Sequence, residues 1–108
     1  MNQQGTEDQG TPAEVVAARK AGDEDRLMRG EDPATTYLED AEHWTGVYSE
    51  LLSFKQDLLA FTKGRIGRMA PPASNELATT DLVIMEAEYA RLRSRHDFWE
   101  TRRRELAG

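Results

Sequence analysis

Apolar residues recur at helical spacing over two long stretches of the chain, and this pattern predicts two helices. In residues 33–66, apolar side chains repeat every seven residues from Tyr37, and a second set follows three residues after the later members of the first. In residues 74–107, the apolar steps alternate between four and three from Ala78 to Leu106. Both patterns are typical of helices that bury one face against another helix.

Local signals place the ends of these helices. Asp32 is a good N-cap and Pro33 fits a first helical turn, so the first helix is expected to begin there. Glycines and a Pro-Pro pair predict a turn over residues 67–73, and Ser74 or Asn75 is expected to cap the second helix. Because a turn this short makes its two helices neighbours, the sequence predicts an all-α fold, a two-helix antiparallel coiled-coil hairpin.

The apolar stripe of the first helix is wider than one partner helix covers. A second row is formed by Leu38, Leu52, Leu59 and Ile66, and a third by Ala41 and Tyr48. A hairpin of this size seldom buries a sufficient core alone, so we expect two copies to form a four-helix bundle as a homodimer. A complex of unlike chains is the alternative. The expected interface residues are Trp44, Val47, Leu51, Phe54, Leu58, Leu82, Met85, Tyr89, Leu92 and Trp99.

Residues 1–32 are expected to form a disordered, flexible acidic tail, because apolar residues are sparse and aromatic residues are absent there. One local signal stands out. Thr11 to Glu14 forms a capping box with proline at the first helical position, which predicts a short helix at residues 12–21. A helix of that length is marginal alone in water, so simple disorder is the competing interpretation.

Composition narrows the class of protein. The chain has 108 residues, which leaves room for one small domain, and its formal net charge is −6. It has no cysteine, which excludes disulfides, thiolate metal sites and cysteine nucleophiles. No secretory signal and no apolar stretch of about 20 residues is found. We therefore expect a cytoplasmic protein that does not enter a membrane.

The C-terminal end is basic although the whole chain is acidic. Residues 91–108 contain six arginines and three acidic residues. Arginines beside aromatic residues bind phosphates and stack on bases, but a solvated face is the simplest interpretation and an acidic protein partner is the next. The net negative charge disfavours nucleic acid. The candidate partner- or anion-binding residues are Arg91, Arg95, Arg102, Arg103 and Arg104. A further hypothesis is that the acidic tail folds back on these arginines and competes with a partner.

A second candidate site is a metal cluster at the open end of the predicted hairpin. With the turn centred near residue 70, His43 lies opposite His96, and Glu39 lies opposite Glu100. Two glutamates and two histidines resemble the ligand set of carboxylate–histidine metal sites, although the spacing departs from the usual Glu-x-x-His. A solvated His43 and a partly buried His96 that fixes register are the simpler interpretation.

No Gly-rich phosphate loop, nucleophile elbow or paired-carboxylate cleft is found, so we expect no enzymatic activity and no cofactor. The sequence favours a small protein–protein interaction module, an adaptor or regulator that acts through a self-associating helical hairpin. Two alternatives stay open. One is a ligand- or metal-responsive bundle, and the other is nucleotide or nucleic-acid binding through the C-terminal arginines.

Overall fold

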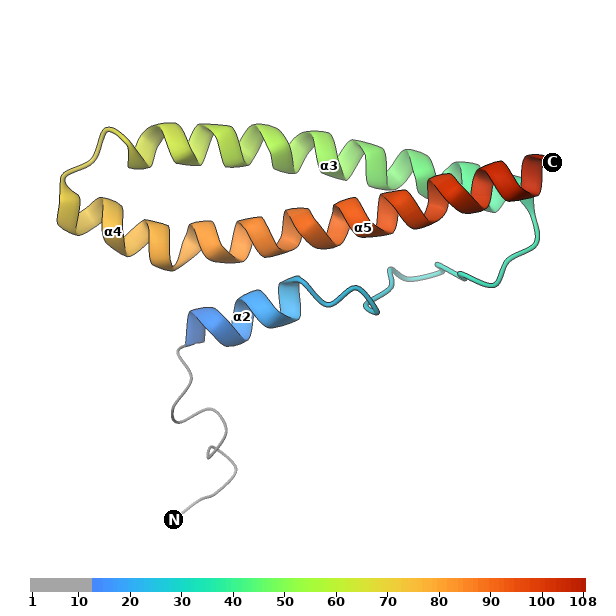
Figure 1. The fold of residues 1–108 in the computed structure, drawn as a ribbon, viewed down its shortest axis with the longest axis horizontal. Helices are drawn as coiled ribbons and strands as arrows, with labels where there is room; N and C mark the ends of the chain where they lie inside the picture. The colour runs from blue at the N-terminus through green and yellow to red at the C-terminus, as the bar shows by residue number, and fades with distance from the viewer. Residues whose placement is uncertain (1–12) are drawn as a thin grey trace, which may run out of the picture.

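A computed structural model describes residues 13–108, in which every regular element is an α-helix. The helices are α2 (Ala13–Ala21), α3 (Leu38–Ile66), α4 (Pro71–Thr79) and α5 (Asp81–Ala107) (Figure 1). The expected all-α class is confirmed for this part of the chain. The first twelve residues of the expected tail lie outside the described residues.

The two long helices, α3 and α5, lie side by side and run in opposite directions (Figure 1). The core between them contains Ala41 and Tyr48 of α3 and Leu92 and Trp99 of α5. The members of each pair are seven residues apart, so they share one helix face. Two ion pairs, Lys55–Glu88 and Lys63–Glu86, also join α3 to α5.

The buried face of α3 is not the face that carries the heptad repeat from Tyr37 and the set that follows it. The fully buried α3 residues, Ala41 and Tyr48, form the third of the apolar rows predicted from the sequence. Phe54 and Phe61 belong to the predicted set that follows three residues after the heptad residues, yet they are 63% and 59% exposed. The apolar arc of α3 is broader than its contact with α5, so the pattern does not determine which part of the arc faces inward.

The first long helix begins at Leu38, five residues later than the sequence predicts. The Asp32 carboxylate accepts a hydrogen bond from the Ala34 N–H, and the Thr35 N–H donates to the Asp32 carbonyl. Asp32 therefore closes a local turn and does not cap a helix. Aspartate side chains often bind nearby backbone N–H groups in turns, and this competes with helix capping. The backbone is still extended at Tyr37, with φ −96° and ψ 127°.

The second predicted helix, over residues 74–107, is divided into α4 and α5. Pro71 and Pro72 occupy the first turn of α4, where a missing N–H is harmless, so they begin a helix that was expected only at residue 74. Thr80 separates α4 from α5 with φ −114° and ψ −83°. Its hydroxyl donates to the carbonyl of Glu76, and such bonds from threonine compete with regular helix geometry.

Residues 13–35, which we call the arm, lie against the long helices (Figure 1). The sequence predicts a flexible tail over residues 1–32, whereas the described part of that segment packs along α5. Gly22 lies at a point of close approach, since a Cβ added there would stand 3.5 Å from the Cβ of Ala87. The arm turns through residues 36–37 into α3. No described helix is both long enough and apolar enough to cross a membrane.

Candidate functional site

The arm presents one acidic side chain on a tight turn. The Glu31 N–H donates to the Met28 carbonyl at 3.0 Å, which closes a turn over residues 28–31. Gly30, the third residue of the turn, has φ +85°. A positive φ at that position is the signature of a type II turn, and glycine adopts it without strain. The Met28 N–H in turn donates to Glu31 Oε1 at 2.8 Å, so the turn aligns the carboxylate.

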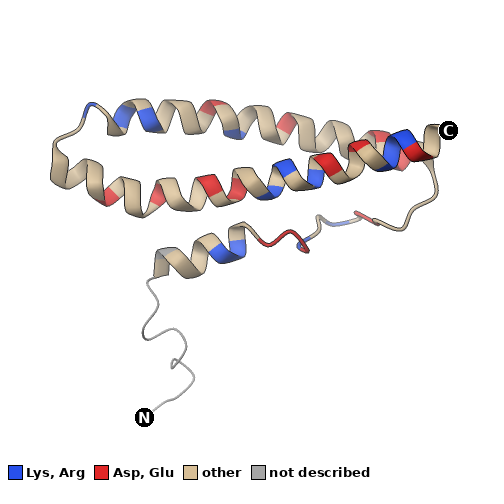
Figure 2. Cartoon of the chain, viewed as in Figure 1, with Lys and Arg blue, Asp and Glu red and all other residues tan. Residues whose placement is uncertain are grey.

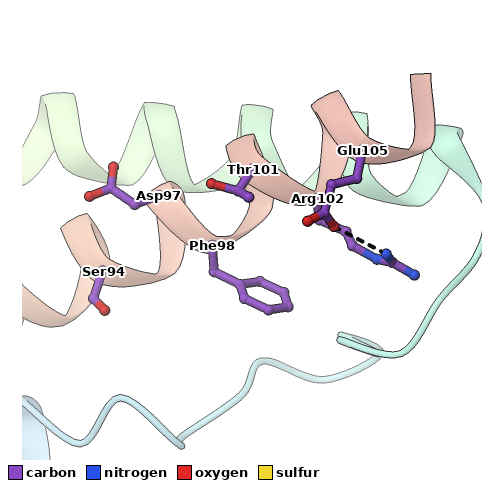
Figure 3. A pocket seen from close by; sticks show the side chains of 6 residues that line it. All are labelled: Ser94, Asp97, Phe98, Thr101, Arg102 and Glu105. Carbon is purple, nitrogen blue, oxygen red and sulfur yellow. Dashed lines mark hydrogen bonds and ion pairs between the residues drawn. The ribbon is translucent and has the colours of Figure 1, made fainter. Parts of the chain in front are cut away.

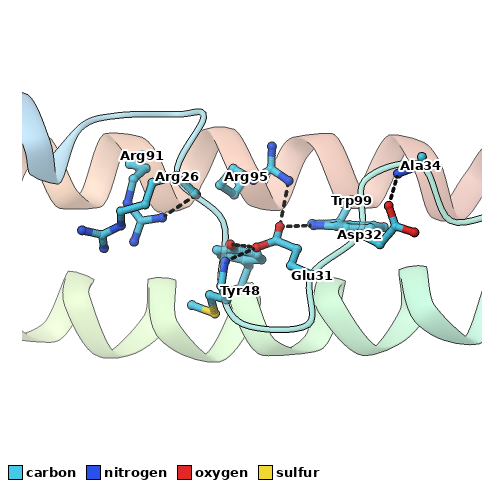
Figure 4. A network of polar contacts seen from close by, with 9 residues as sticks. Arg26, Glu31, Asp32, Ala34, Tyr48, Arg91, Arg95 and Trp99 are labelled. Atoms are coloured by element: carbon cyan, nitrogen blue, oxygen red, sulfur yellow. Dashed lines mark hydrogen bonds and ion pairs between the residues drawn. The ribbon is translucent and has the colours of Figure 1, made fainter.

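The Glu31 carboxylate lies between α3 and α5 and is fully buried, with 0% of its side chain exposed (Figure 4). Its Oε1 also accepts a hydrogen bond from the Tyr48 hydroxyl at 2.7 Å. Its Oε2 accepts two more, one from Arg95 Nη2 and one from Trp99 Nε1, both at 2.7 Å. Each carboxylate oxygen thus accepts two hydrogen bonds. Hydrogen bonds to a charged group are roughly twice as strong as neutral ones. We call the three side-chain donors the carboxylate cradle.

The cradle favours the ionised carboxylate. Burial alone would raise the pKa of Glu31. The backbone N–H of Met28 and the three cradle donors outweigh this effect and lower the pKa of Glu31 below its ordinary value. The pKa of the Tyr48 hydroxyl is raised, first by burial and then by its bond to Glu31. At neutral pH the site therefore holds a carboxylate, a neutral phenol and a guanidinium.

The helices that supply the cradle align its donors by simple spacing. Arg95 and Trp99 are four residues apart on α5 and so share a face. Tyr48 projects from the buried face of α3. The donors belong to different helices, so the cradle exists only where α3 and α5 pack together.

Two further arginines bind the backbone of the arm. Arg91 Nε donates to the Ala21 carbonyl at 3.1 Å, and its Nη1 lies 3.5 Å from the Arg26 carbonyl (Figure 4). Arg102 Nη2 donates to the Thr35 carbonyl at 2.9 Å. These contacts hold the arm along α5 through its main-chain carbonyls and do not depend on its side chains. The basic positions of α5 are concentrated in its second half (Figure 2).

The five predicted anion-binding arginines therefore divide into two sets. Arg91, Arg95 and Arg102 bind the arm. Arg103 donates twice to Glu100, at 2.6 and 3.3 Å, and Arg104 lies 3.5 Å from the same carboxylate. The hydrogen bond from Arg103 lowers the pKa of Glu100, and the same bond raises the pKa of Arg103. The second set forms pairs within α5.

The structure does not bring the predicted metal ligands together. Glu39 is exposed in the first turn of α3, and His43 packs edge-on against the Trp44 ring, 4.9 Å between centroids. His96 lies 3.8 Å from Asp97. Glu100 is held by the arginines that follow it. Among residues 13–108, no group of three or more histidine, aspartate or glutamate side chains is arranged to hold a metal ion.

A shallow pocket of about 360 Å³ lies on α5 beside the arm (Figure 3). Its apolar floor is the ring of Phe98, over which the Arg95 guanidinium stacks at 4.7 Å. Asp97 and the ion pair between Arg102 Nη1 and Glu105 Oε1, 3.3 Å apart, also line the pocket. Because the charges around the ring have both signs, the pocket has no strong preference for an anion or a cation.

A second feature is an apolar row on α3 that the chain leaves partly uncovered. The row consists of Val47, Leu51, Phe54, Leu58 and Phe61. The two phenylalanines are exposed and the other three are half-buried. A cleft of about 230 Å³ separates the row from the arm and is lined by Met28, Leu51, Phe54 and Leu92 among others. The other predicted interface residues lie in or beside the α3–α5 contact; Leu92 and Trp99 are buried in the core.

Sequence reasoning missed Glu31, Gly30 and the polar role of Tyr48 and Trp99. One signal was present in the sequence, since Met-Arg-Gly-Glu followed by Asp-Pro is typical of consecutive turns. The hypothesis that the tail folds back on the arginines anticipated the contact, although one acidic side chain of the arm makes it. Comparison of the chain with protein-family models, curated proteins and solved structures gave no match.

Proposed function

We propose that this protein is a non-enzymatic protein–protein interaction module, an adaptor or regulator, built on a helical hairpin that self-associates. The observation that carries the proposal is the apolar row on α3. Its five members follow one another at steps of four and three, so they form a continuous stripe along one side of the helix. Single exposed apolar residues are ordinary, but a continuous stripe marks an interaction surface.

The partner that fits this stripe is a second copy of the chain. In a two-fold arrangement, the row of one copy packs against the row of the other, which makes the contact self-complementary. Two α3–α5 pairs joined in this way form a four-helix bundle, the arrangement that covers a second apolar face on a helical hairpin. Aromatic residues such as Phe54 and Phe61 are enriched in the centres of such interfaces.

The arginines support this interpretation over binding of nucleic acid. Arg91, Arg95 and Arg102 already donate to the arm, so a phosphate would have to compete with bonds formed within the chain. Arg103 and Arg104 share the carboxylate of Glu100. These five arginines of α5 are therefore already paired with acceptors in the arm or with Glu100.

The test is the oligomeric state of the full chain and of two variants, measured by native mass spectrometry and by light scattering over a range of concentrations. The wild type is expected at twice 12.2 kDa. Phe54→Glu is expected to shift it to the monomer, because Phe54 is exposed within one chain and buried only between chains. Ser49→Glu adds the same charge on the opposite side of α3 and is the matched control. A wild-type monomer at every concentration, or equal behaviour of both variants, contradicts the proposal.

A further inference from the structure

The arm and the surface that holds it behave as a ligand and a receptor within one chain. The arm contributes the Glu31 carboxylate and the main-chain carbonyls of Ala21 and Thr35. The receptor contributes donors from α3 and α5, in the cradle and at Arg91 and Arg102, and one acceptor, the Asp40 carboxylate, which the Thr35 hydroxyl binds at 2.6 Å. Each of these contacts therefore joins the arm to the surface that α3 and α5 form together.

The chemistry of this receptor is selective. Arginines that bind main-chain carbonyl oxygens do not select particular side chains, whereas the buried cradle requires a carboxylate at one position. The type II turn at residues 28–31 sets that position, and Met28 packs beside the core as an apolar anchor. A segment that fits must therefore combine an apolar residue with a glutamate three residues later across a glycine turn. This chain carries such a segment itself.

The connection between the arm and α3 is short and exposed. Thr36 and Tyr37 are both exposed, and Tyr37 is extended and gives α3 no side-chain cap. Rotation in these two residues redirects the arm without disturbing the α3–α5 core. The first helix of the arm, α2, packs against α5 and is too short to be stable alone. A released arm therefore regains its ordered structure only by binding a groove of the same kind.

We propose that the groove on α3 and α5 also accepts the arm of a second copy, so that two chains exchange their arms. The exchange is a route to the self-association proposed above and rests on it. The arm makes the same contacts with the groove in either arrangement, so the free-energy cost of exchange is small. The fraction of exchanged dimer depends on protein concentration. Each copy gives one arm and receives one arm, so the assembly closes as a dimer.

The absence of cysteine allows a direct test with two full-length chains. One carries Gly22→Cys and the other carries Ala87→Cys. A Cβ at position 22 lies 3.5 Å from the Cβ of Ala87, a separation that suits a disulfide. The chains are mixed, equilibrated and oxidised, and the linked pair is measured by mass under non-reducing conditions. Neither chain forms the 22–87 bond alone, so the bond reports an arm that lies on the other copy.

Two controls define the background. Ala107→Cys replaces Ala87→Cys on the same helix, about 30 Å further along at 1.5 Å per residue. Glu31→Gln, added to the Gly22→Cys chain, removes the charge that the cradle recognises. Exchange predicts a 22–87 yield at least tenfold above the 22–107 yield, and a clear decrease with Glu31→Gln.

Equal 22–87 and 22–107 yields overturn the exchange, provided that the Gly22→Cys/Ala87→Cys double variant closes its disulfide within one chain. If native mass spectrometry still shows a dimer, self-association stands and only the exchange fails. A second measurement avoids cysteine and uses a mixture of Glu31→Gln and Arg95→Met chains. Exchange restores one native arm–groove pair in the mixed dimer, so a melting transition above those of both parents is expected. A melting curve equal to the sum of the parents contradicts the exchange.

Discussion

Trp99 Nε1 donates a 2.7 Å hydrogen bond to Oε2 of Glu31, which lies 68 residues earlier in the chain. The indole fills the α3–α5 core and its only polar atom binds the arm, so one side chain both packs the core and holds the arm in place. The stability of the arm and that of the helix pair are therefore linked through a single buried carboxylate.

Replacement of Glu31 is expected to destabilise the protein. Glu31→Ala leaves the Arg95 guanidinium buried without its partner and is expected to lower the free energy of unfolding by about 3–5 kcal/mol. Glu31→Gln keeps the shape and loses the charge, and about 1–3 kcal/mol is expected. Urea unfolding followed by circular dichroism measures both. Asp32→Asn, at an exposed neighbouring carboxylate, should change stability by less than about 0.5 kcal/mol. A Glu31→Gln variant as stable as Asp32→Asn would show that the cradle contributes nothing.

Stability is expected to fall in acid through this same group. The pKa of Glu31 is lowered in the folded protein from an ordinary value of 4.5, so the unfolded chain binds a proton at a higher pH than the folded chain does. The contribution of Glu31 is therefore fully present above about pH 4.5 and is lost as the pH decreases through the folded pKa. Between pH 7 and pH 3, the difference in melting temperature between the wild type and Glu31→Gln should begin to decrease below about pH 4.5. A constant difference across that range would contradict this assignment.

Two glycines should respond to alanine in opposite directions. Gly30 has φ +85° and open space around it, so Gly30→Ala meets backbone strain alone and is expected to cost about 1–2 kcal/mol. Gly46 lies inside α3 with equally open space, and Gly46→Ala is expected to stabilise by about 0.5–1 kcal/mol. Thermal unfolding of the two variants beside the wild type measures both effects. A neutral Gly30→Ala variant would mean that the turn at residues 28–31 does not form.

The Tyr48 hydroxyl should matter only through the arm. Tyr48→Phe keeps the aromatic ring in the core and removes one donor from Glu31, for an expected loss of about 1.5–3 kcal/mol. Tyr37→Phe, at an exposed ring, should change stability by less than about 0.5 kcal/mol. In a double-mutant cycle with Glu31→Gln, the Tyr48→Phe loss should decrease, because the two changes remove the same interaction. Strict additivity would place the effect of the hydroxyl elsewhere.

The sequence predicts the features of this fold that depend on local signals. The helical class follows from apolar periodicity, and the end of α3 at Ile66 and of α5 at Ala107 follow from glycine. The start of α3 is less predictable, because Asp32 followed by proline suits a turn as well as a helix cap. The inward face of α3 depends on what else packs there, which periodicity does not encode.

The site itself could not be predicted from local pattern. A buried glutamate is stable only where donors meet it, and those donors come from Tyr48, Arg95 and Trp99, which are 17, 64 and 68 residues further along the chain. In the sequence, Glu31 is one of several acidic residues in a polar stretch. Charge asymmetry between the ends of the chain indicated attraction in general, but it could not select one residue.

The cradle also sets an order of events during synthesis. Its donors Arg95 and Trp99, and Arg102, which binds the Thr35 carbonyl, follow the arm residues that they hold by 64 to 68 residues. The arm leaves the ribosome before α5, and its binding site is complete only after most of α5 has emerged and paired with α3. The arm is therefore synthesised before its binding site, and until α5 has emerged a protease or a chaperone meets residues 13–35 without the contacts that hold them.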